Sequence, residues 1–131
     1  MYKFKIKSQK KIYEINFKDN LKNIINNIYS VNDVLIIDNT VFKKNIKYKF
    51  FNNKKIIKIQ INEIAKDYYS VGNFIKKLLN YDFSKKNKLI VIGGGITQDI
   101  SSFISHIIFR GVEWIYIPTT LLSQADSCIG S

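Results

Sequence analysis

Three consecutive glycines at residues 93–95 stand between an apolar run and a helical pattern. A strand-to-helix turn without side chains lets the backbone approach a phosphate closely, and the helix N–H groups and dipole then face its charge. The run reads Gly-x-Gly-x-x-Gln, so the third glycine of the dinucleotide fingerprint is missing, and the acid expected roughly twenty residues later is not evident. A purely structural turn therefore stays an alternative to a phosphate site.

Two other polar segments follow apolar runs, at residues 38–40 (Asp-Asn-Thr) and 118–120 (Pro-Thr-Thr). In an open α/β sheet, ligands bind beyond the carboxyl ends of the strands, so we expect these segments and the glycines to meet at one groove. Asp38 is placed to accept hydrogen bonds from a ribose diol. An Asx turn explains the same residue without a ligand.

Arg110 is the only arginine of the chain. Its planar, permanently protonated guanidinium suits a phosphate or carboxylate better than a flexible ammonium does; a helix-terminal charge beside Gly111 is the alternative. Asp99 is predicted in the first turn of the helix after the glycines, where the helix dipole favours a carboxylate for structural reasons alone. We interpret His106 as a packed or surface side chain and Cys128, the single cysteine, as a packing residue.

Alternating and helical patterns predict the elements that position these residues. Strands over 2–6 and 12–17, turned around residues 8–10, form an opening hairpin. Helices are predicted over 21–28, 64–79 and 96–108, and further strands over 34–37, 56–61, 89–92 and 114–117. Gly111 is predicted to close the third helix as a left-handed cap. Because strands that are solid apolar runs alternate with helices, the predicted fold class is α/β, with a Rossmann-like, mainly parallel sheet and flanking helices.

The composition is that of a folded globular protein, since 46% of the 131 residues are hydrophobic and 14% aromatic. A net charge of +11 would suit nucleic acid, but every lysine lies within residues 1–88. We therefore interpret the lysines as a solvated coat, and nucleic acid as the less favoured partner. No apolar stretch resembles a signal-peptide core or approaches membrane-spanning length, so we expect a soluble cytoplasmic protein without a membrane partner.

Residues 93–99 (GGGITQD), 110–112 (RGV) and 117–127 (IPTTLLSQADS) form a composite pattern that is far more specific than any one of its segments. Over residues 89–131 this pattern resembles the 3-dehydroquinate synthase family and its sugar-phosphate cyclase relatives. Upstream, Asp38-Asn39 and the Glu-x-x-Lys of residues 63–66 resemble the same family. Gln98 stands where a glycine is usual, and residues 127–131 (SCIGS) differ from the usual Ser-Ser-Val-Gly-Gly, which leaves the sugar substrate open.

The resemblance implies that residues 1–131 are the N-terminal NAD-binding domain of a two-domain enzyme. It implies NAD contacts for Asp38, Asn39, Thr40, Glu63, Lys66, Gly94, Gly95, Ile96, Asp99, Thr119 and Thr120. Arg110 and Asp126 are expected to face a sugar acid phosphate. No metal ligand is expected in this chain. The family's divalent metal, zinc or cobalt, is held by a Glu and two His of a C-terminal helical domain, and these, with a lysine that meets the substrate and the catalytic residues generally, are expected beyond Ser131.

The implied activity is that of an NAD- and metal-dependent lyase of the shikimate pathway, which leads to aromatic amino acids. NAD transiently oxidises a hydroxyl of 3-deoxy-arabino-heptulosonate 7-phosphate, phosphate is eliminated, the ketone is reduced again, and the opened sugar closes to 3-dehydroquinate. Because the chain stops directly after a turn-like stretch, we expect an N-terminal fragment that is inactive alone. A homodimer is compatible with this expectation.

Three alternatives stay open at this point. The first is a cyclase for another sugar phosphate. The second is an NAD-dependent polyol or glycerol-phosphate dehydrogenase with the same fold and glycine turn, which would accumulate NADH, whereas a cyclase returns its hydride. The third is a non-catalytic basic module that binds RNA with a steep salt dependence.

Overall fold

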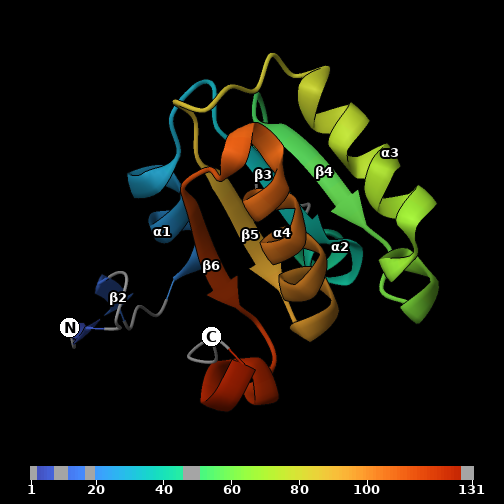
Figure 1. Ribbon diagram of the computed structural model, residues 1–131. Coiled ribbons are helices and arrows are strands. Elements are labelled where there is room, and N and C mark those ends of the chain that lie inside the picture. Colours follow the sequence, from blue (N-terminus) through green and yellow to red (C-terminus); the bar gives the residue numbers. More distant parts are fainter. Residues whose placement is uncertain (1–2, 8–11, 17–19, 46–50, 128–131) are drawn as a thin grey trace.

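The computed structural model describes residues 3–7, 12–16, 20–45 and 51–127 (Figure 1). Its main sheet is parallel, with the strand order β4-β3-β5-β6. These strands are β3 (Val34–Asp38), β4 (Lys55–Ile59), β5 (Leu89–Gly93) and β6 (Trp114–Pro118). The predicted Rossmann-like α/β class is confirmed.

The strand register brings the carboxyl ends of the central strands to one edge of the sheet. Ile37 at the end of β3 lies opposite Ile92 of β5, and Gly93 lies opposite Pro118 at the end of β6. All five residues of both β3 and β5 are buried, as expected for strands covered on two faces. The three polar segments that follow these strands therefore leave the sheet on the same side.

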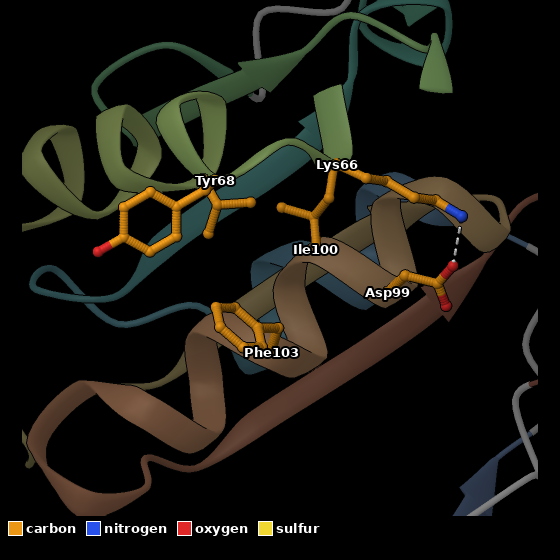
Figure 2. Close-up of a pocket in the computed structure, with 6 residues that line it drawn as sticks. Lys66, Tyr68, Asp99, Ile100 and Phe103 are labelled. Carbon is orange, nitrogen blue, oxygen red and sulfur yellow. Dashed lines mark ion pairs between the residues drawn. The ribbon is translucent and has the colours of Figure 1, made fainter. Parts of the chain in front are cut away.

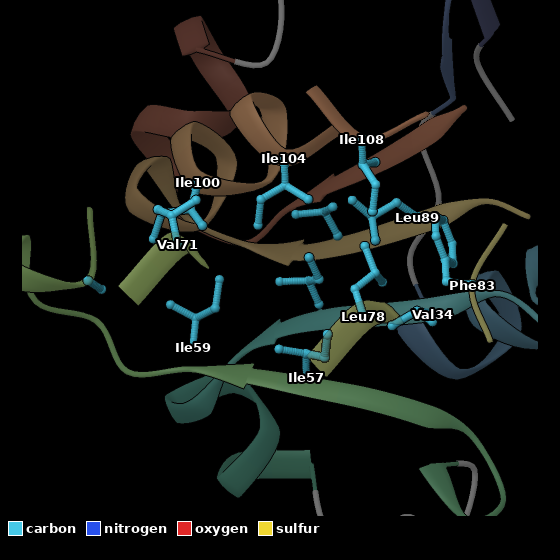
Figure 3. Packing of buried hydrophobic residues seen from close by; sticks show 13 residues of the cluster. Val34, Ile57, Ile59, Val71, Leu78, Phe83, Leu89, Ile100, Ile104 and Ile108 are labelled. Atoms are coloured by element: carbon cyan, nitrogen blue, oxygen red, sulfur yellow. The ribbon is translucent and has the colours of Figure 1, made fainter. Parts of the chain in front are cut away.

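Helices cover both faces of the sheet, and each face has its own apolar cluster. On one face, α1 (Leu21–Ile28) and α2 (Asn39–Asn45) pack against β3 and β5 through Ile25 and Phe42. On the other face, α3 (Tyr68–Leu79) and α4 (Gly95–Ile107) pack through Leu78 and Ile104. Figure 3 shows this second cluster, in which side chains of α3 and α4 meet those of β3, β4 and β5.

The opening hairpin is confirmed in its strands, because β1 (Lys3–Lys7) pairs antiparallel with β2 (Ile12–Asn16). The turn predicted around residues 8–10 lies outside the described residues. None of the helices in the described ranges has the length and apolarity needed to span a bilayer.

The predicted helix over 64–79 is wrong at its start. A 3₁₀ helix, η2 (Glu63–Lys66), comes first, and α3 begins only after Asp67, whose backbone is extended (φ −66°, ψ 156°). Ile64 and Tyr68, whose spacing predicted an apolar face shared with Val71, are 72% and 84% exposed. The spacing of apolar residues continues across the break between η2 and α3 and therefore did not reveal it. The break is set by Asp67, which caps α3 by accepting the Ser70 N–H at 2.8 Å.

The end of α4 also differs from the prediction. A 3₁₀ segment, η3 (Ile108–Arg110), follows the helix, and the left-handed residues are Phe109 (φ 50°, ψ 28°) and Arg110 (φ 61°). Gly111 instead has φ 98° and ψ 132°, a conformation that is still open mainly to glycine. A left-handed conformation costs about 1–2 kcal/mol for an ordinary L-residue, so this turn is strained at two neighbouring positions.

Candidate functional site

The glycine segment forms the strand-to-helix turn that its sequence predicts. Gly93 ends β5, Gly94 is the N-cap of α4, and Gly95 is the first residue of the helix. No side chain caps this helix terminus. The first N–H groups of α4 therefore have no intrahelical partner, and they lie at the edge of the sheet where β3 and β6 also end.

The three glycines are constrained by different neighbours. A Cβ on Gly93 would lie 2.5 Å from Thr97 Oγ1, and a Cβ on Gly94 would lie 2.9 Å from Thr120 Cγ2. A Cβ on Gly95 would meet nothing within 4 Å. Packing inside the chain thus explains the first two glycines, and the space beside Gly95 is open.

The segment after β6 lies against the glycine turn. The Thr119 N–H donates to the Gly93 carbonyl at 2.9 Å, and the Tyr116 hydroxyl donates to the same carbonyl at 3.0 Å. Thr120 Oγ1 is 2.7 Å from Ser123 Oγ, whose side chain is buried. Both predicted threonines are therefore brought next to the predicted glycines.

Asp38 ends β3 and is 5% exposed. Its Oδ1 accepts the Thr40 N–H at 2.6 Å, so the Asx turn considered from the sequence is present. Within the described residues no hydrogen bond occupies its Oδ2. Asn39 begins α2, an element not predicted from the sequence, and its side chain donates to Gln60 Oε1 at 3.1 Å.

Lys66 and Asp99 form an ion pair of 2.8 Å between η2 and α4. Asp99 is the fifth residue of α4, so its predicted place in the first turn is wrong; its carboxylate faces Lys66. A hollow of about 330 Å³ lies between η2, the start of α3 and α4. Figure 2 shows the ion pair at one end of this hollow. The remaining lining residues are Tyr68, Val71, Ile100 and Phe103, so apart from the ion pair the hollow is mainly apolar.

The other predicted residues lie elsewhere. Glu63 is the first residue of η2, and Ile96 is the second residue of α4. Asp126 lies in η4 (Ser123–Ser127). Arg110 is exposed at the far end of α4, beside the start of β5, where the Leu89 N–H donates to the Glu113 carbonyl. The structure thus does not bring Arg110 to the edge that holds the glycines.

Three residues of the site were missed by sequence reasoning. Ser123 holds the Thr120 hydroxyl, Tyr116 holds the Gly93 carbonyl, and Gln60 holds the Asn39 amide. The Thr-x-x-Ser spacing of residues 120–123 could have indicated the first, since a serine three residues after a threonine can meet its hydroxyl in a turn. The other two contacts join different strands and helices, and no local pattern signals them.

Many lysines make local contacts, in agreement with a coat on the fold. The Lys3 ammonium, 2.6 Å from Glu14, is the main cause that lowers the pKa of that carboxyl. Lys55 Nζ donates to the Tyr81 carbonyl, and Lys58 Nζ lies 3.8 Å from the centre of the Phe42 ring. Within the described part of the chain, no group of three or more His, Cys, Asp or Glu side chains could hold a metal ion.

Comparison with known proteins places the chain among relatives of one kind. Residues 56–131 match the family model described as 3-dehydroquinate synthase N-terminal. The 3-dehydroquinate synthase of Buchnera aphidicola subsp. Cinara cedri is 40% identical over 105 residues, which cover 76% of this chain and 29% of that protein. The one from Pelagibacter ubique is 33% identical over 140 residues, covering 99% of this chain and 38% of that protein. The chain thus spans about a third of the length of these curated relatives.

A solved structure supports the fold. A 2-deoxy-scyllo-inosose synthase, crystallised with carbaglucose-6-phosphate, NAD+ and Co2+, superposes with a TM-score of 0.78 at 20% sequence identity. The match covers 96% of this chain and 38% of that one. At 20% identity, this structural match supports the fold of the domain.

Proposed function

We propose a function from the premise that this chain belongs to the 3-dehydroquinate synthase family, whose model matches more than half of it. The chain forms the NAD-binding domain of a sugar-phosphate cyclase. Its substrate is 3-deoxy-arabino-heptulosonate 7-phosphate, which loses phosphate and closes to 3-dehydroquinate. The divalent metal, zinc or cobalt, is held by residues outside these 131. The curated relatives are longer than this chain, and we place the metal ligands in their additional part.

The uncapped start of α4 carries this proposal. Its first N–H groups have no side-chain cap, and Gly95 leaves open space where any larger residue would place a side chain. A pyrophosphate is the ligand chemistry that such a terminus favours, because it accepts several hydrogen bonds and carries negative charge. The residues present therefore fit a dinucleotide.

The surrounding side chains have separate tasks in this proposal. Asp38, with Oδ1 held by the Thr40 N–H, accepts a ribose hydroxyl through Oδ2. Thr119 and Thr120, fixed against the glycine turn, offer hydroxyls toward the second half of the dinucleotide. Bound NAD supplies a hydride acceptor that returns the hydride within the same turnover.

The Lys66–Asp99 pair balances charge near the start of α4. An unpaired Asp99 would repel a pyrophosphate, and the Lys66 ammonium at 2.8 Å offsets that carboxylate. Glu63, Ile96 and Asn39 complete the predicted contacts, on η2, α4 and α2 respectively.

Arg110 enters the proposal only through a second copy of the chain. It follows the 13 residues of α4, and a helix of that length spans about 20 Å. An arginine at that distance from the glycine turn does not reach a substrate bound there in its own chain. We therefore assign Arg110 to the substrate of a neighbouring subunit in a homodimer. Asp126 serves the substrate in its own chain.

The first experiment measures NAD binding to the 131-residue chain by isothermal titration calorimetry. Gly95→Ala should weaken binding about tenfold or more, because its methyl group occupies the approach to the helix terminus, while thermal stability is kept or raised. Gly72→Ala in α3 is the matched control, since its Cβ also meets nothing within 4 Å. Absence of NAD binding to the unmodified chain, or equal affinity of both variants, contradicts the proposal.

The second experiment tests turnover. A chimera in which residues 1–131 replace the matching segment of the Buchnera relative should release phosphate from the heptulosonate phosphate without accumulating NADH, whereas the chain alone should release none. Net NADH on a polyol would favour the dehydrogenase alternative. Tight RNA retention with a steep salt slope would favour the basic module.

A further inference from the structure

The peptide between Gly93 and Gly94 joins the end of β5 to the start of α4. It is trans and planar, so its carbonyl and its N–H point in opposite directions and turn together. Both flanking residues lack a Cβ, which leaves the rotation of this peptide less restricted than between other residues. The direction of the Gly94 N–H therefore depends on what holds the Gly93 carbonyl.

Two donors from the side of β6 hold this carbonyl. The Thr119 N–H donates to it at 2.9 Å and the Tyr116 hydroxyl at 3.0 Å. The first hydrogen bond continues the ladder between β5 and β6, since Gly93 lies opposite Pro118 in the register. The second comes from a side chain and is added to the ladder. Because a carbonyl oxygen has two lone pairs, the two donors occupy both of them and limit rotation of the peptide.

The ring of Tyr116 is itself held in place. It is half-buried against the apolar cluster on the face of the sheet that α3 and α4 cover. It also stacks on Trp114, with the ring centroids 6.1 Å apart and an interplanar angle of 30°. A hydroxyl on a ring fixed in this way loses little further freedom when it donates a hydrogen bond.

The Gly94 N–H points away from β6 and toward the end of β3, because the carbonyl of the same peptide points toward β6. The strand order β4-β3-β5-β6 places the topological switch point between β3 and β5, since the chain continues from β3 to one side and from β5 to the other. Ligands of open α/β sheets bind at this position. Within the described residues the Gly94 N–H has no hydrogen-bond acceptor, so this donor is available to a ligand there.

We infer that Tyr116 is a positioning residue for the dinucleotide: its hydroxyl, through the Gly93 carbonyl, directs the Gly94 N–H at the pyrophosphate. The inference rests on the function proposed above. In this role Tyr116 does not touch the ligand. Removal of its hydroxyl therefore leaves every ligand-binding group in the chain and changes only how firmly one N–H is directed.

Tyr116→Phe in the 131-residue chain tests this role, because it removes the hydroxyl and keeps the packed ring. Isothermal titration calorimetry should show about three- to tenfold weaker NAD binding, the effect of one hydrogen bond. In isotope-labelled protein, the amide resonance of Gly94 should move in the variant before any ligand is added, since its own peptide has lost a hydrogen bond. It should also respond less to added NAD than in the unmodified chain.

Tyr81→Phe is the matched control. Tyr81 is also half-buried against the same apolar cluster, and its hydroxyl also donates to a strand carbonyl, that of Ile56 at 3.1 Å. Ile56 is the second residue of β4, at the end of the sheet away from the glycine turn. Both substitutions should lower the melting temperature by a similar few degrees. Only Tyr116→Phe should weaken NAD binding and move the Gly94 resonance.

Equal NAD affinity of the two variants would overturn the inference, since a general loosening of the fold explains an equal loss. An unmoved Gly94 resonance in Tyr116→Phe would overturn it as well. If the unmodified chain binds no NAD, the proposed function fails and the inference fails with it. If the unmodified chain binds NAD and the two variants bind it equally, the role of Tyr116 alone is wrong.

Discussion

Two buried hydroxyls of α4 lower the stability of the fold, and single substitutions can remove them. Thr97 Oγ1 and Ser101 Oγ are buried and have no hydrogen-bond partner among the residues that the structure describes, whereas Ser105 Oγ donates to the Ser102 carbonyl at 2.7 Å. An unsatisfied buried hydroxyl costs about 1–3 kcal/mol. Ser101→Ala should therefore raise the free energy of unfolding by about 1 kcal/mol, measured by urea denaturation.

Ser105→Ala is the control for helix propensity, since both substitutions gain the same preference of alanine for a helix. It should be less stabilising than Ser101→Ala, because it also removes a hydrogen bond that is satisfied. If Ser101→Ala proves the less stable of the two variants, the Ser101 hydroxyl has a partner in solution, such as a buried water.

At the residue scale, the sequence predicted where the polar residues of the site lie better than it predicted their hydrogen-bond and ion-pair partners. The glycines and the two threonines lie together as expected because each follows a strand whose end the apolar run had located. The partners of Asp99 and Asn39 were not predictable, since Lys66 and Gln60 reach them across separate elements. Arg110 lies away from the glycines because a helix after a strand returns to the opposite edge of the sheet.

At the scale of elements, the start of α3 depends on one exposed carboxylate. Asp67 accepts from both the N–H and the hydroxyl of Ser70, and these hydrogen bonds, the backbone one first, lower the pKa of Asp67 below its ordinary value of 3.8. A group whose pKa is lower in the folded state stabilises the fold above its unfolded pKa, and that contribution disappears as the pH falls through the folded value.

Asp67→Ala should therefore lower the melting temperature at neutral pH, because the cap is lost. The difference from the unmodified chain should shrink as the pH falls below about 4, where the carboxylate of the unmodified chain becomes protonated. Thermal melts of both proteins across this range provide the check. Asp67→Asn, which keeps an acceptor for the Ser70 N–H, should show a smaller loss at neutral pH; a loss that is constant with pH would contradict the role of the charge.

The break between η2 and α3 shows why periodicity alone misplaced an element. Ile64, Tyr68 and Val71 have helical spacing, but the extended backbone of Asp67 turns the first two away from the core. Helix α2 was missed for a related reason, because the polar segment that was interpreted as a turn after β3 contains its first residues, Asn39 and Thr40. In both places a side chain that hydrogen-bonds to a neighbouring N–H decided the boundary, and the apolar pattern did not.

At the scale of the whole molecule, the two outer strands of the sheet, β4 and β6, carry different side chains. The edge strand β4 carries Lys55 and Lys58, which discourage pairing with another chain. The edge strand β6 carries Trp114, Ile115, Tyr116 and Ile117, all half-buried, and is followed by Leu121 and Leu122, which are 83% and 73% exposed. Two neighbouring, strongly exposed leucines thus lie beside the strand that ends at the candidate site.

Neighbouring exposed leucines next to an edge strand predict that this surface governs aggregation of the isolated chain. Replacing both Leu121 and Leu122 with serine should delay the onset of light scattering in a concentration series. The melting temperature should stay close to that of the unmodified chain, because these side chains contribute little buried area. Val31→Ser is the control: Val31 is equally exposed, at 83%, but stands alone on a loop, so its replacement should leave scattering unchanged. Equal scattering of all three proteins would mean that another surface causes the aggregation. A clear loss of stability in the double variant would mean that the leucines pack against the domain in solution.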